Sequence, residues 1–302
     1  MTDAGPRDLA SEFEASRGRL RAIAYRMLGS LSDADDAAQE TWLRLSRSNA
    51  DDLANLDGWL TTVVSRICLD MLRSRSARRE EPLGEHLPDP IVSRLDGADP
   101  EQESELADQV GMALLVVLDK LSPAERLAFV LHDMFAVPFD DIAAIVGRSP
   151  SAAAQLASRG RRRVRGSAVA TDTSLARQRE VVAAWLAAAR SGEFDALLTL
   201  LDPDVVVRID FGALAAGGLR EVRGAAQVVG LATSYRRSAS FAHAALVCGS
   251  AGIVVTADGG PPSVMAFTFA AGKIAEIYIL ADRSRLTRLG LAATDSSTGT
   301  SG

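Results

Sequence analysis

Side chains that could contact nucleic acid are concentrated in a helix predicted between Ser149 and Gly166. Serine can cap the free backbone amides at a helix start and proline suits the first helical turn, so Ser149 and Pro150 mark its beginning. One thin face of this helix is small and apolar. Its outward face carries amide, hydroxyl and guanidinium groups, which can hydrogen-bond to base edges and phosphates in the major groove of DNA. These outward residues are Gln155, Ser158, Arg159, Arg161 and Arg162.

Two shorter helices would hold this helix in place. Ser122 followed by Pro123 predicts the start of the first, and Pro138 to Val146 shows apolar residues at the spacing of a second. The three helices together predict a helix-turn-helix from Leu121 to Gly166. An ordinary three-helix bundle with a solvated basic face would share part of this pattern. The coincidence of a short turn, a slim helix and an arginine cluster favours the nucleic-acid interpretation.

The bulk properties limit the classes of protein to consider. With 302 residues the chain can form two or three domains, and its formal charge of −6 argues against a protein that coats DNA through a uniformly positive surface. Cys68 and Cys248 show no metal-ligand spacing with the three histidines, which predicts buried thiols, no metal and no cofactor. The chain shows neither a signal peptide nor an apolar run of membrane-span length, which predicts a cytoplasmic protein without membrane contact.

Three further helices are predicted before residue 80. The first carries apolar residues from Phe13 to Met27, and the second starts at Ser32 and is acidic near its N-terminus. Those acidic residues suit the helix dipole, which explains them as a solvated face, but they could also dock a basic partner. The third helix runs from Asp57 to Arg79 and accumulates arginines toward its end, more than the dipole alone requires.

Several motifs follow one another in the order and spacing of the sigma-70 family of transcription initiation factors. They are DADDAAQETWLRL, GWL followed by LDMLRS, LSPAERLAFVL and FDDIAAIVGRSPSAAAQLASRGRRR. The first three helices resemble region 2 of that family, and the helix-turn-helix resembles region 4. The compact layout resembles the extracytoplasmic-function (ECF) group. The resemblance implies a region 2 domain at 8–80, an acidic linker at 81–108 and a region 4 domain at 109–168.

The resemblance also implies partners and contact residues. A protein of this family binds core RNA polymerase and promoter DNA and performs no chemistry itself, so no catalytic residue is expected. The residues expected to dock on the polymerase are Asp33, Asp35, Asp36, Glu40 and Trp42. Those expected near the minus-10 element are Trp59, Arg66, Asp70, Arg73 and Arg75. Those expected near the minus-35 element are Ala154, Gln155, Ser158, Arg159, Arg161 and Arg162.

The composition changes after Gly166, and from about residue 175 the pattern is helices followed by a four-strand meander. That order predicts an α+β cone with a central pocket, and it resembles the SnoaL-like branch of the nuclear-transport-factor-2 (NTF2) superfold. The expected fold class is therefore multidomain, with two all-α domains and a C-terminal α+β cone at 175–290. Residues 291–302 are expected to be a disordered tail.

A sigma-J-like subgroup of the ECF group carries such a cone as an attached regulator, which could hold a small ligand in its pocket. HLPDP in the linker resembles a WLPEP-like motif of that subgroup, with His86 in place of tryptophan. DFGALAAGGLREVRG and ADRSRL are the nearest matches to its glycine-rich and C-terminal motifs. The residues expected to form the regulatory contact are His86, Leu87, Pro88, Asp210, Asp282 and Arg283.

Two other classes of protein fit part of the sequence. One is a one-component repressor, in which a ligand-sensing C-terminal domain controls a single helix-turn-helix. The other is a cyclase or isomerase fused to a DNA-binding module, with Asp210, His243 and Tyr278 as acid/base candidates in the cavity. Neither alternative explains the acidic and arginine-rich helices before residue 80.

Overall fold

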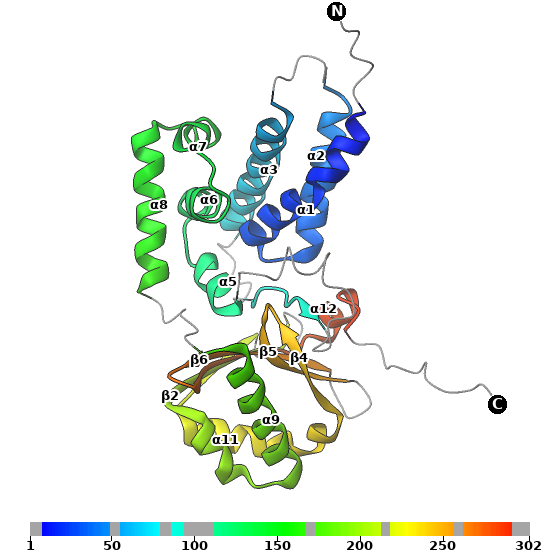
Figure 1. Cartoon of the computed structure of the whole chain (residues 1–302), viewed down its shortest axis with the longest axis vertical. Helices are drawn as coiled ribbons and strands as arrows, with labels where there is room; N and C mark the ends of the chain where they lie inside the picture. Colours follow the sequence, from blue (N-terminus) through cyan, green and yellow to red (C-terminus); the bar gives the residue numbers. More distant parts are fainter. Residues whose placement is uncertain are drawn as a thin grey trace, which may run out of the picture. The chain divides into compact units, whose positions relative to one another are not determined.

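The computed structural model describes residues 8–48, 55–78, 86–93, 111–166, 173–212, 218–256 and 262–291. The chain forms two compact units (Figure 1). The helical unit comprises Met1–Pro82, Ser104–Leu106 and Leu114–Ala168. The cone unit comprises Leu83–Glu103, Ala107–Ala113 and Val169–Gly302.

Three helices form the first half of the helical unit. They are α1 (Leu9–Leu28), α2 (Leu31–Leu45) and α3 (Leu56–Arg78). Gly29 ends α1 in the left-handed conformation at φ 69°, and the Ser30 side chain then accepts a hydrogen bond from the Asp33 amide to start α2. Apolar residues of all three helices, such as Ile23 and Leu60, are completely buried and form one core.

The second half of the helical unit contains the predicted helix-turn-helix. Its elements are α5 (Met112–Asp119), α6 (Pro123–Phe129), a π-helical turn η2 (Val130–Met134), α7 (Phe139–Val146) and α8 (Pro150–Arg165). The first two residues of α5 are grouped with the cone unit. Helices α6 and α7 both pack against α8 (Figure 1). The helix boundaries agree with the capping residues Ser122, Pro138 and Ser149 read from the sequence.

A buried arginine joins the two halves of the helical unit. The Arg126 side chain on α6 is 2% exposed, and its Nε donates to the Arg26 carbonyl oxygen on α1 at 3.0 Å. Its Nη1 donates to Asp119 Oδ1 at 3.1 Å. Burial lowers the pKa of Arg126 from its usual value, although the Asp119 carboxylate opposes that effect. The α1–α6 contact therefore contains a largely desolvated guanidinium.

The cone unit is a sheet covered by helices. Its strands are β1 (Val92–Ser93), β2 (Leu201–Asp210), β3 (Leu219–Arg223), β4 (Ala242–Val247), β5 (Ser250–Val255), β6 (Ser263–Ala270) and β7 (Lys273–Leu280). They lie in the order β1-β4-β5-β6-β7-β2-β3. Strands β2 and β7 pair in parallel, and every other pair is antiparallel.

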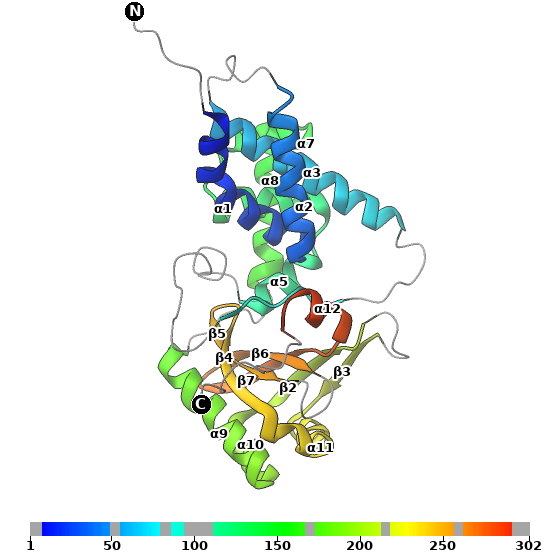
Figure 2. The same ribbon diagram turned by 90° about the vertical axis from the view of Figure 1, so that its right-hand side faces the viewer.

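The helices of the cone unit are α9 (Leu175–Ser191), η3 (Phe194–Ala196), α10 (Leu197–Leu200), α11 (Ala225–Ser234), η4 (Arg236–Phe241) and α12 (Arg283–Arg288). Figure 2 shows α9, α10 and α11 on one face of the sheet and α12 on the other. The main apolar core lies under α9, where Trp185 contacts Phe267 with 5.8 Å between ring centroids. The predicted fold class, two helical modules and an α+β cone, is confirmed.

Part of the expected acidic linker is folded onto the cone unit. Composition predicted an extended segment over 81–108, but residues 86–93 pack on the sheet, and Val92 and Ser93 pair with Val247 and Leu246 of β4. Leu87 and Ile91 are buried there, which explains why an acidic stretch with few bases still docks. The remaining linker residues, and all of the expected disordered tail 291–302 except Leu291, lie outside the described residues.

Candidate functional site

Helix α8 presents polar side chains over a small-residue seam. The Ser149 hydroxyl accepts a hydrogen bond from the Ala152 amide at 3.2 Å and so caps the helix. Gly160 faces α6 so closely that a Cβ would lie 3.0 Å from Phe129 Cβ. Glycine allows this close approach without a shift of Phe129, and the opposite face of α8 is held outward. That face exposes Gln155, Ser158, Arg159 and Arg162, whereas Ala154 and Arg161 are half-buried.

Carboxylates of the neighbouring helices engage part of the arginine cluster. Glu125 on α6 is contacted by Arg159 Nε at 3.1 Å and by Arg163 Nη1 at 2.7 Å. Asp133 on η2 is contacted by Arg161 Nε at 2.7 Å. Among the described residues, no ion pair engages Arg162. Of the six minus-35 candidates, Gln155, Ser158 and Arg162 are outward donors, Arg159 and Arg161 already have an intramolecular partner, and Ala154 has no polar side chain.

Glu125 organises the start of α6 as well as the α8 arginines. Its carboxylate accepts from the Ser122 hydroxyl at 2.9 Å and from the Ser122 amide at 3.3 Å, while the Glu125 amide donates to the Ser122 hydroxyl. This is a reciprocal capping box. Burial opposes ionisation, but the Ser122 hydrogen bonds and the Arg163 and Arg159 charges outweigh it and lower the pKa of Glu125.

The expected polymerase-docking residues lie on or beside the exposed side of α2. Asp35 forms an ion pair with Arg21 of α1 at 2.5 Å, and Glu40 forms one with Arg44 at 2.9 Å. Asp36 is exposed. Half-buried Trp42 packs on Phe13, with ring centroids 5.1 Å apart. These contacts still leave one side of Asp35 and Glu40 open to water.

One ion pair connects two predicted surfaces. Asp33, expected to dock on the polymerase, is bonded through Oδ2 to Nη2 of Arg75, which is expected near the minus-10 element. Arg75 Nη1 also donates to the Leu28 carbonyl oxygen at 3.1 Å. In this structure Arg75 therefore ties the end of α3 to the α1–α2 corner.

The other minus-10 candidates lie along the exposed side of α3. Trp59 is half-buried near its start, and Asp70 and Arg73 are exposed with their side chains 3.8 Å apart. Arg66 is exposed and its Nη2 donates to the Ala144 carbonyl oxygen of α7 at 3.3 Å. The structure thus brings α3 against α7, and one candidate DNA contact is engaged inside the helical unit.

A buried carboxylate holds the linker segment, residues 86–93, on the cone unit. Asp210 is 0% exposed and accepts from the Leu87 amide at 2.9 Å and from the Gly212 amide at 2.9 Å. His86 Nδ1 lies 3.3 Å from Asp210 Oδ1. Gly212 has φ 82°, and a Cβ there would collide with the Asp282 carboxylate, so glycine is required at this position. Of the expected regulatory residues, His86, Leu87 and Asp210 do come together.

Arg285 completes this contact and was missed by the sequence analysis, which named Arg283. Arg285 Nη1 donates to Asp210 Oδ2 at 2.8 Å, Nη2 donates to the Leu87 carbonyl oxygen at 2.7 Å, and Nε donates to Asp89 Oδ1 at 3.1 Å. Arg283 is exposed. Asp282 contributes indirectly, because its carboxylate caps α12 by accepting from the Ser284 amide at 2.9 Å. The ADRSRL motif contained a signal for this contact, because Asp282 caps the helix that begins at Arg283 and Arg285 is the third residue of that helix.

The acid/base candidates do not line the cavity of the cone unit. Ile209 and Phe211 line it, so Asp210 between them faces the opposite side of the sheet. Tyr278 likewise alternates with the lining residues Ile277 and Ile279. Burial and then the Glu276 carboxylate raise the pKa of Tyr278, whose hydroxyl donates to Glu276. His243 is exposed on β4. The expectation that these three groups could point into the cavity is therefore wrong.

Three further properties concern the described residues alone. No group of three histidine, cysteine or carboxylate side chains in that part of the chain is arranged to hold a metal ion. Cys68 and Cys248 are buried and form no disulfide, and burial raises the pKa of the Cys68 thiol to about 12. Within the described ranges, no helix has the length and apolarity that crossing a bilayer requires.

Known proteins match both the modules and the whole chain. Residues 13–78 match the family described as Sigma-70 region 2, and residues 111–164 match Sigma-70, region 4. The ECF RNA polymerase sigma factor SigJ of Mycobacterium tuberculosis is 40% identical over 291 residues, which cover 92% of this chain and 93% of the relative. A probable ECF RNA polymerase sigma factor, SigI, from the same species is 36% identical over 93% of this chain and 96% of its own length.

A solved structure agrees with these matches along the whole chain. The crystal structure of the Mycobacterium tuberculosis extracytoplasmic function sigma factor SigJ has a TM-score of 0.74 and 37% identity, covering 92% of this chain and 98% of that chain. The match includes the cone as well as the helical modules. The chain therefore belongs to the ECF RNA polymerase sigma factors, with sigma-70 regions 2 and 4 followed by an α+β cone.

Proposed function

We propose that this sigma factor binds core RNA polymerase and directs it to promoters through α8 at the minus-35 element and α3 at the minus-10 element. The observation that carries the proposal is the outward face of α8. Gln155, Ser158 and Arg162 are exposed there, while Gly160 and its neighbours pack against α6. A helix held in this way can enter the major groove without rearranging its own module.

The α8 side chains have different tasks in this proposal. Gln155 is suited to a base edge, because an amide can donate and accept together. Arg162 is suited to phosphate or guanine. Arg159 and Arg161 can position the helix from their ion pairs with Glu125 and Asp133, or exchange those carboxylates for DNA phosphates. Sequence preference then depends mainly on Gln155 and its exposed neighbours.

Region 2 contributes the polymerase contact and the minus-10 contact. The acidic side of α2, with Asp35, Asp36 and Glu40, is proposed to dock on a basic surface of the core enzyme. Trp59 and Arg73 on α3 are proposed to lie nearest the opened strands. Two candidates are engaged internally, because Arg75 bonds to Asp33 and Arg66 bonds to α7. For Arg66 and Arg75 to contact DNA, each must first break its bond inside the helical unit.

We also propose that the cone unit regulates this activity through the linker segment and performs no turnover of its own. The support is the fully buried contact of Asp210 with Leu87, together with the Arg285 bridge to Asp89. Whenever these bonds form, residues 86–93 are held on the cone and are not available to another partner. The proposal assigns the protein to the cytoplasm, where a polymerase subunit acts.

Run-off transcription tests the main proposal. Purified core polymerase, the full chain and a promoter selected by the protein should give a product of defined length, and core polymerase alone should not. The Asp36→Ala and Glu40→Ala double variant should bind the core enzyme more weakly, whereas Glu180→Ala, an exposed carboxylate on α9, should not. Specific DNA binding without polymerase, combined with no transcript, would instead support the one-component repressor.

A further inference from the structure

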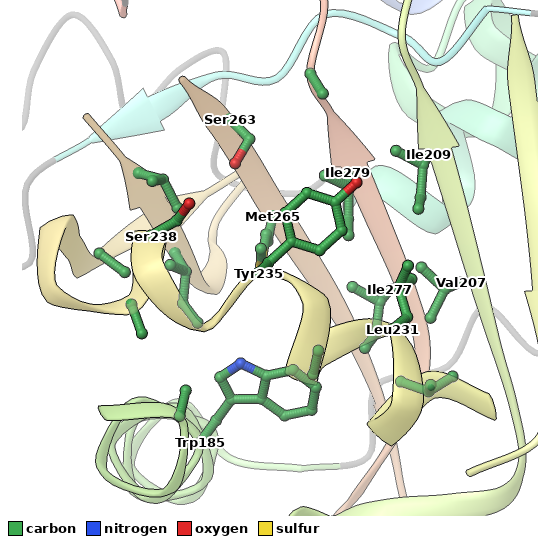
Figure 3. A pocket seen from close by; sticks show the side chains of 18 of the residues that line it. Trp185, Val207, Ile209, Leu231, Tyr235, Ser238, Ser263, Met265, Ile277 and Ile279 are labelled. Carbon is green, nitrogen blue, oxygen red and sulfur yellow. The ribbon is translucent and has the colours of Figure 1, made fainter. Parts of the chain in front are cut away.

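The cone unit encloses a cavity of about 200 Å³ between the inner face of its sheet and helices α9, α11 and η4 (Figure 3). Its walls consist mainly of aliphatic and aromatic side chains. These include Trp185, Ile209, Leu231, Met265 and Ile279. One water molecule needs only about 15 Å³ of such space, so the cavity is large enough for a small organic molecule. Its lining resembles that of ligand pockets, which are mostly apolar with few polar groups.

The polar groups of the lining restrict the chemistry of an occupant. Among the described residues, no lining side chain carries a formal charge at neutral pH. The available polar atoms are the hydroxyls of Tyr235, Ser238 and Ser263 and the indole nitrogen of Trp185, and Tyr235 is 47% exposed. A carboxylate, phosphate or ammonium group would therefore enter without a charged partner, which is strongly unfavourable. An uncharged ligand with one or two hydrogen-bonding groups fits.

Strands β2 and β7 contribute to both the cavity wall and the seat of the linker segment. On β2, Ile209 and Phe211 line the cavity, and Asp210 between them binds the Leu87 amide on the other face. On β7, Ile277 and Ile279 line the cavity. The intervening outer-face residues Tyr278 and Leu280 lie beneath Leu87, Pro88 and Pro90 of the linker segment. If an occupant displaces β2 and β7, the residues of these strands that contact the linker segment move with them.

We propose that this cavity binds an uncharged, predominantly apolar small molecule and that its occupancy is coupled to the seating of the linker segment on the opposite face of β2 and β7. Ala281 strengthens the connection, since it lines the cavity and precedes Asp282, which caps the helix carrying Arg285. A ligand that presses on this wall therefore alters the position of the bonds that hold Leu87 and Asp89. The proposal names the chemical class of the ligand that would regulate the cone unit. Any effect of this ligand on transcription rests on the regulatory role proposed above for the cone unit.

Binding is tested on the full chain with two fluorescent probes of the same skeleton. N-phenyl-1-naphthylamine is uncharged, and 8-anilinonaphthalene-1-sulfonate adds one sulfonate. We expect the uncharged probe to bind at one site and the sulfonate to bind at least tenfold more weakly. Ala232→Phe places a ring in the cavity and should abolish binding, whereas Ala226→Phe, an exposed position on the same helix, should leave it unchanged.

Ser238→Phe is a second cavity-filling variant in case Ala232→Phe disturbs the fold, and circular dichroism verifies that each variant is folded. Equal affinity for both probes, or undiminished binding in a folded cavity-filling variant, would overturn the binding proposal. Coupling is measured as amide hydrogen exchange of residues 86–93, which should change at least threefold on saturation with the uncharged probe. Unchanged exchange at saturation would overturn the coupling. Neither measurement uses polymerase or promoter DNA, so their failure leaves the sigma-factor proposal standing.

Discussion

A single glutamate links the cap of one helix to the arginines of the next. Glu125 closes the capping box with Ser122 and pairs with Arg159 and Arg163, and its side chain is only 7% exposed. Because the folded state lowers the pKa of Glu125, ionisation of this residue stabilises the fold. That contribution is complete above the unfolded pKa of about 4.3 and is lost as the pH falls through the lower folded value.

Glu125→Gln should destabilise the helical unit by about 1–2 kcal/mol at pH 7, because it removes a charged capping group and two ion pairs. The difference from the parent chain should shrink when the pH is lowered below about 4. Urea unfolding at several pH values measures both effects. Asp141→Asn, an exposed carboxylate on α7, is the control and should change stability by less than about 0.5 kcal/mol. A pH-independent difference would contradict the role of the charge.

Gln155 and Arg162 should respond differently when each is replaced by alanine. Gln155→Ala should relax preference at one minus-35 position, with a loss of about 1–3 kcal/mol at the preferred base. Arg162→Ala, if this side chain contacts phosphate, should weaken all promoters similarly and make binding less dependent on salt. Holoenzyme affinity for single-base promoter variants at two salt concentrations separates these results. If both variants behave like the parent chain, the assignment of α8 as recognition helix is wrong.

At the scale of elements, the short helix α12 and the linker segment stabilise each other. Arg285→Ala should destabilise the cone unit by about 3–5 kcal/mol, since it leaves Asp210 and Asp89 buried without their guanidinium. The neighbouring exposed variant Arg283→Ala should have little effect. Denaturant unfolding and proteolysis within residues 86–93 measure the two consequences. Equal stability of both variants would show that Arg285 does not hold the linker segment.

At the scale of the whole molecule, the cone should alter the output of the helical modules. A chain that ends at Ala168 keeps both sigma-70 matches, 13–78 and 111–164, and lacks most of the cone unit. We expect its run-off transcription to differ at least twofold from that of the full chain at one or more promoters. Equal output at every promoter tested would remove the regulatory proposal and leave the sigma-factor assignment intact.

The helices and the order of the modules were readable from local signals. Ser122, Pro138 and Ser149 each begin a helix where the sequence predicted it, because capping depends on neighbouring residues only. The meander β4–β7 was also predicted, since its strands alternate with recognisable turns. The domain boundaries at 8–80, 109–168 and 175–290 stay a prediction, as do the roles of the contact residues.

The contacts that depend on distant parts of the chain could not be read in this way. Pairing of Val92 with Val247 and the bridge from Arg285 to Asp89 join residues far apart in the sequence. On β2, Arg208 and Asp210 alternate with Val207 and Ile209, but the sequence alone does not say which of the two faces looks into the cavity. This is why Asp210 was considered for the cavity, although it faces the linker segment.

The buried guanidinium of Arg126 affects the free energy needed to separate α1 and α6. Its Nη2 is buried and has no hydrogen-bond partner among the described residues. Separation of the two helices would return this charge to water, and its hydration would offset part of the free energy needed to expose the apolar side chains around it. Leucine or methionine in the same place would lack this offset and would favour the closed contact. The two halves of the helical unit are therefore joined by a contact in which hydration of a charged side chain would offset part of the cost of separation.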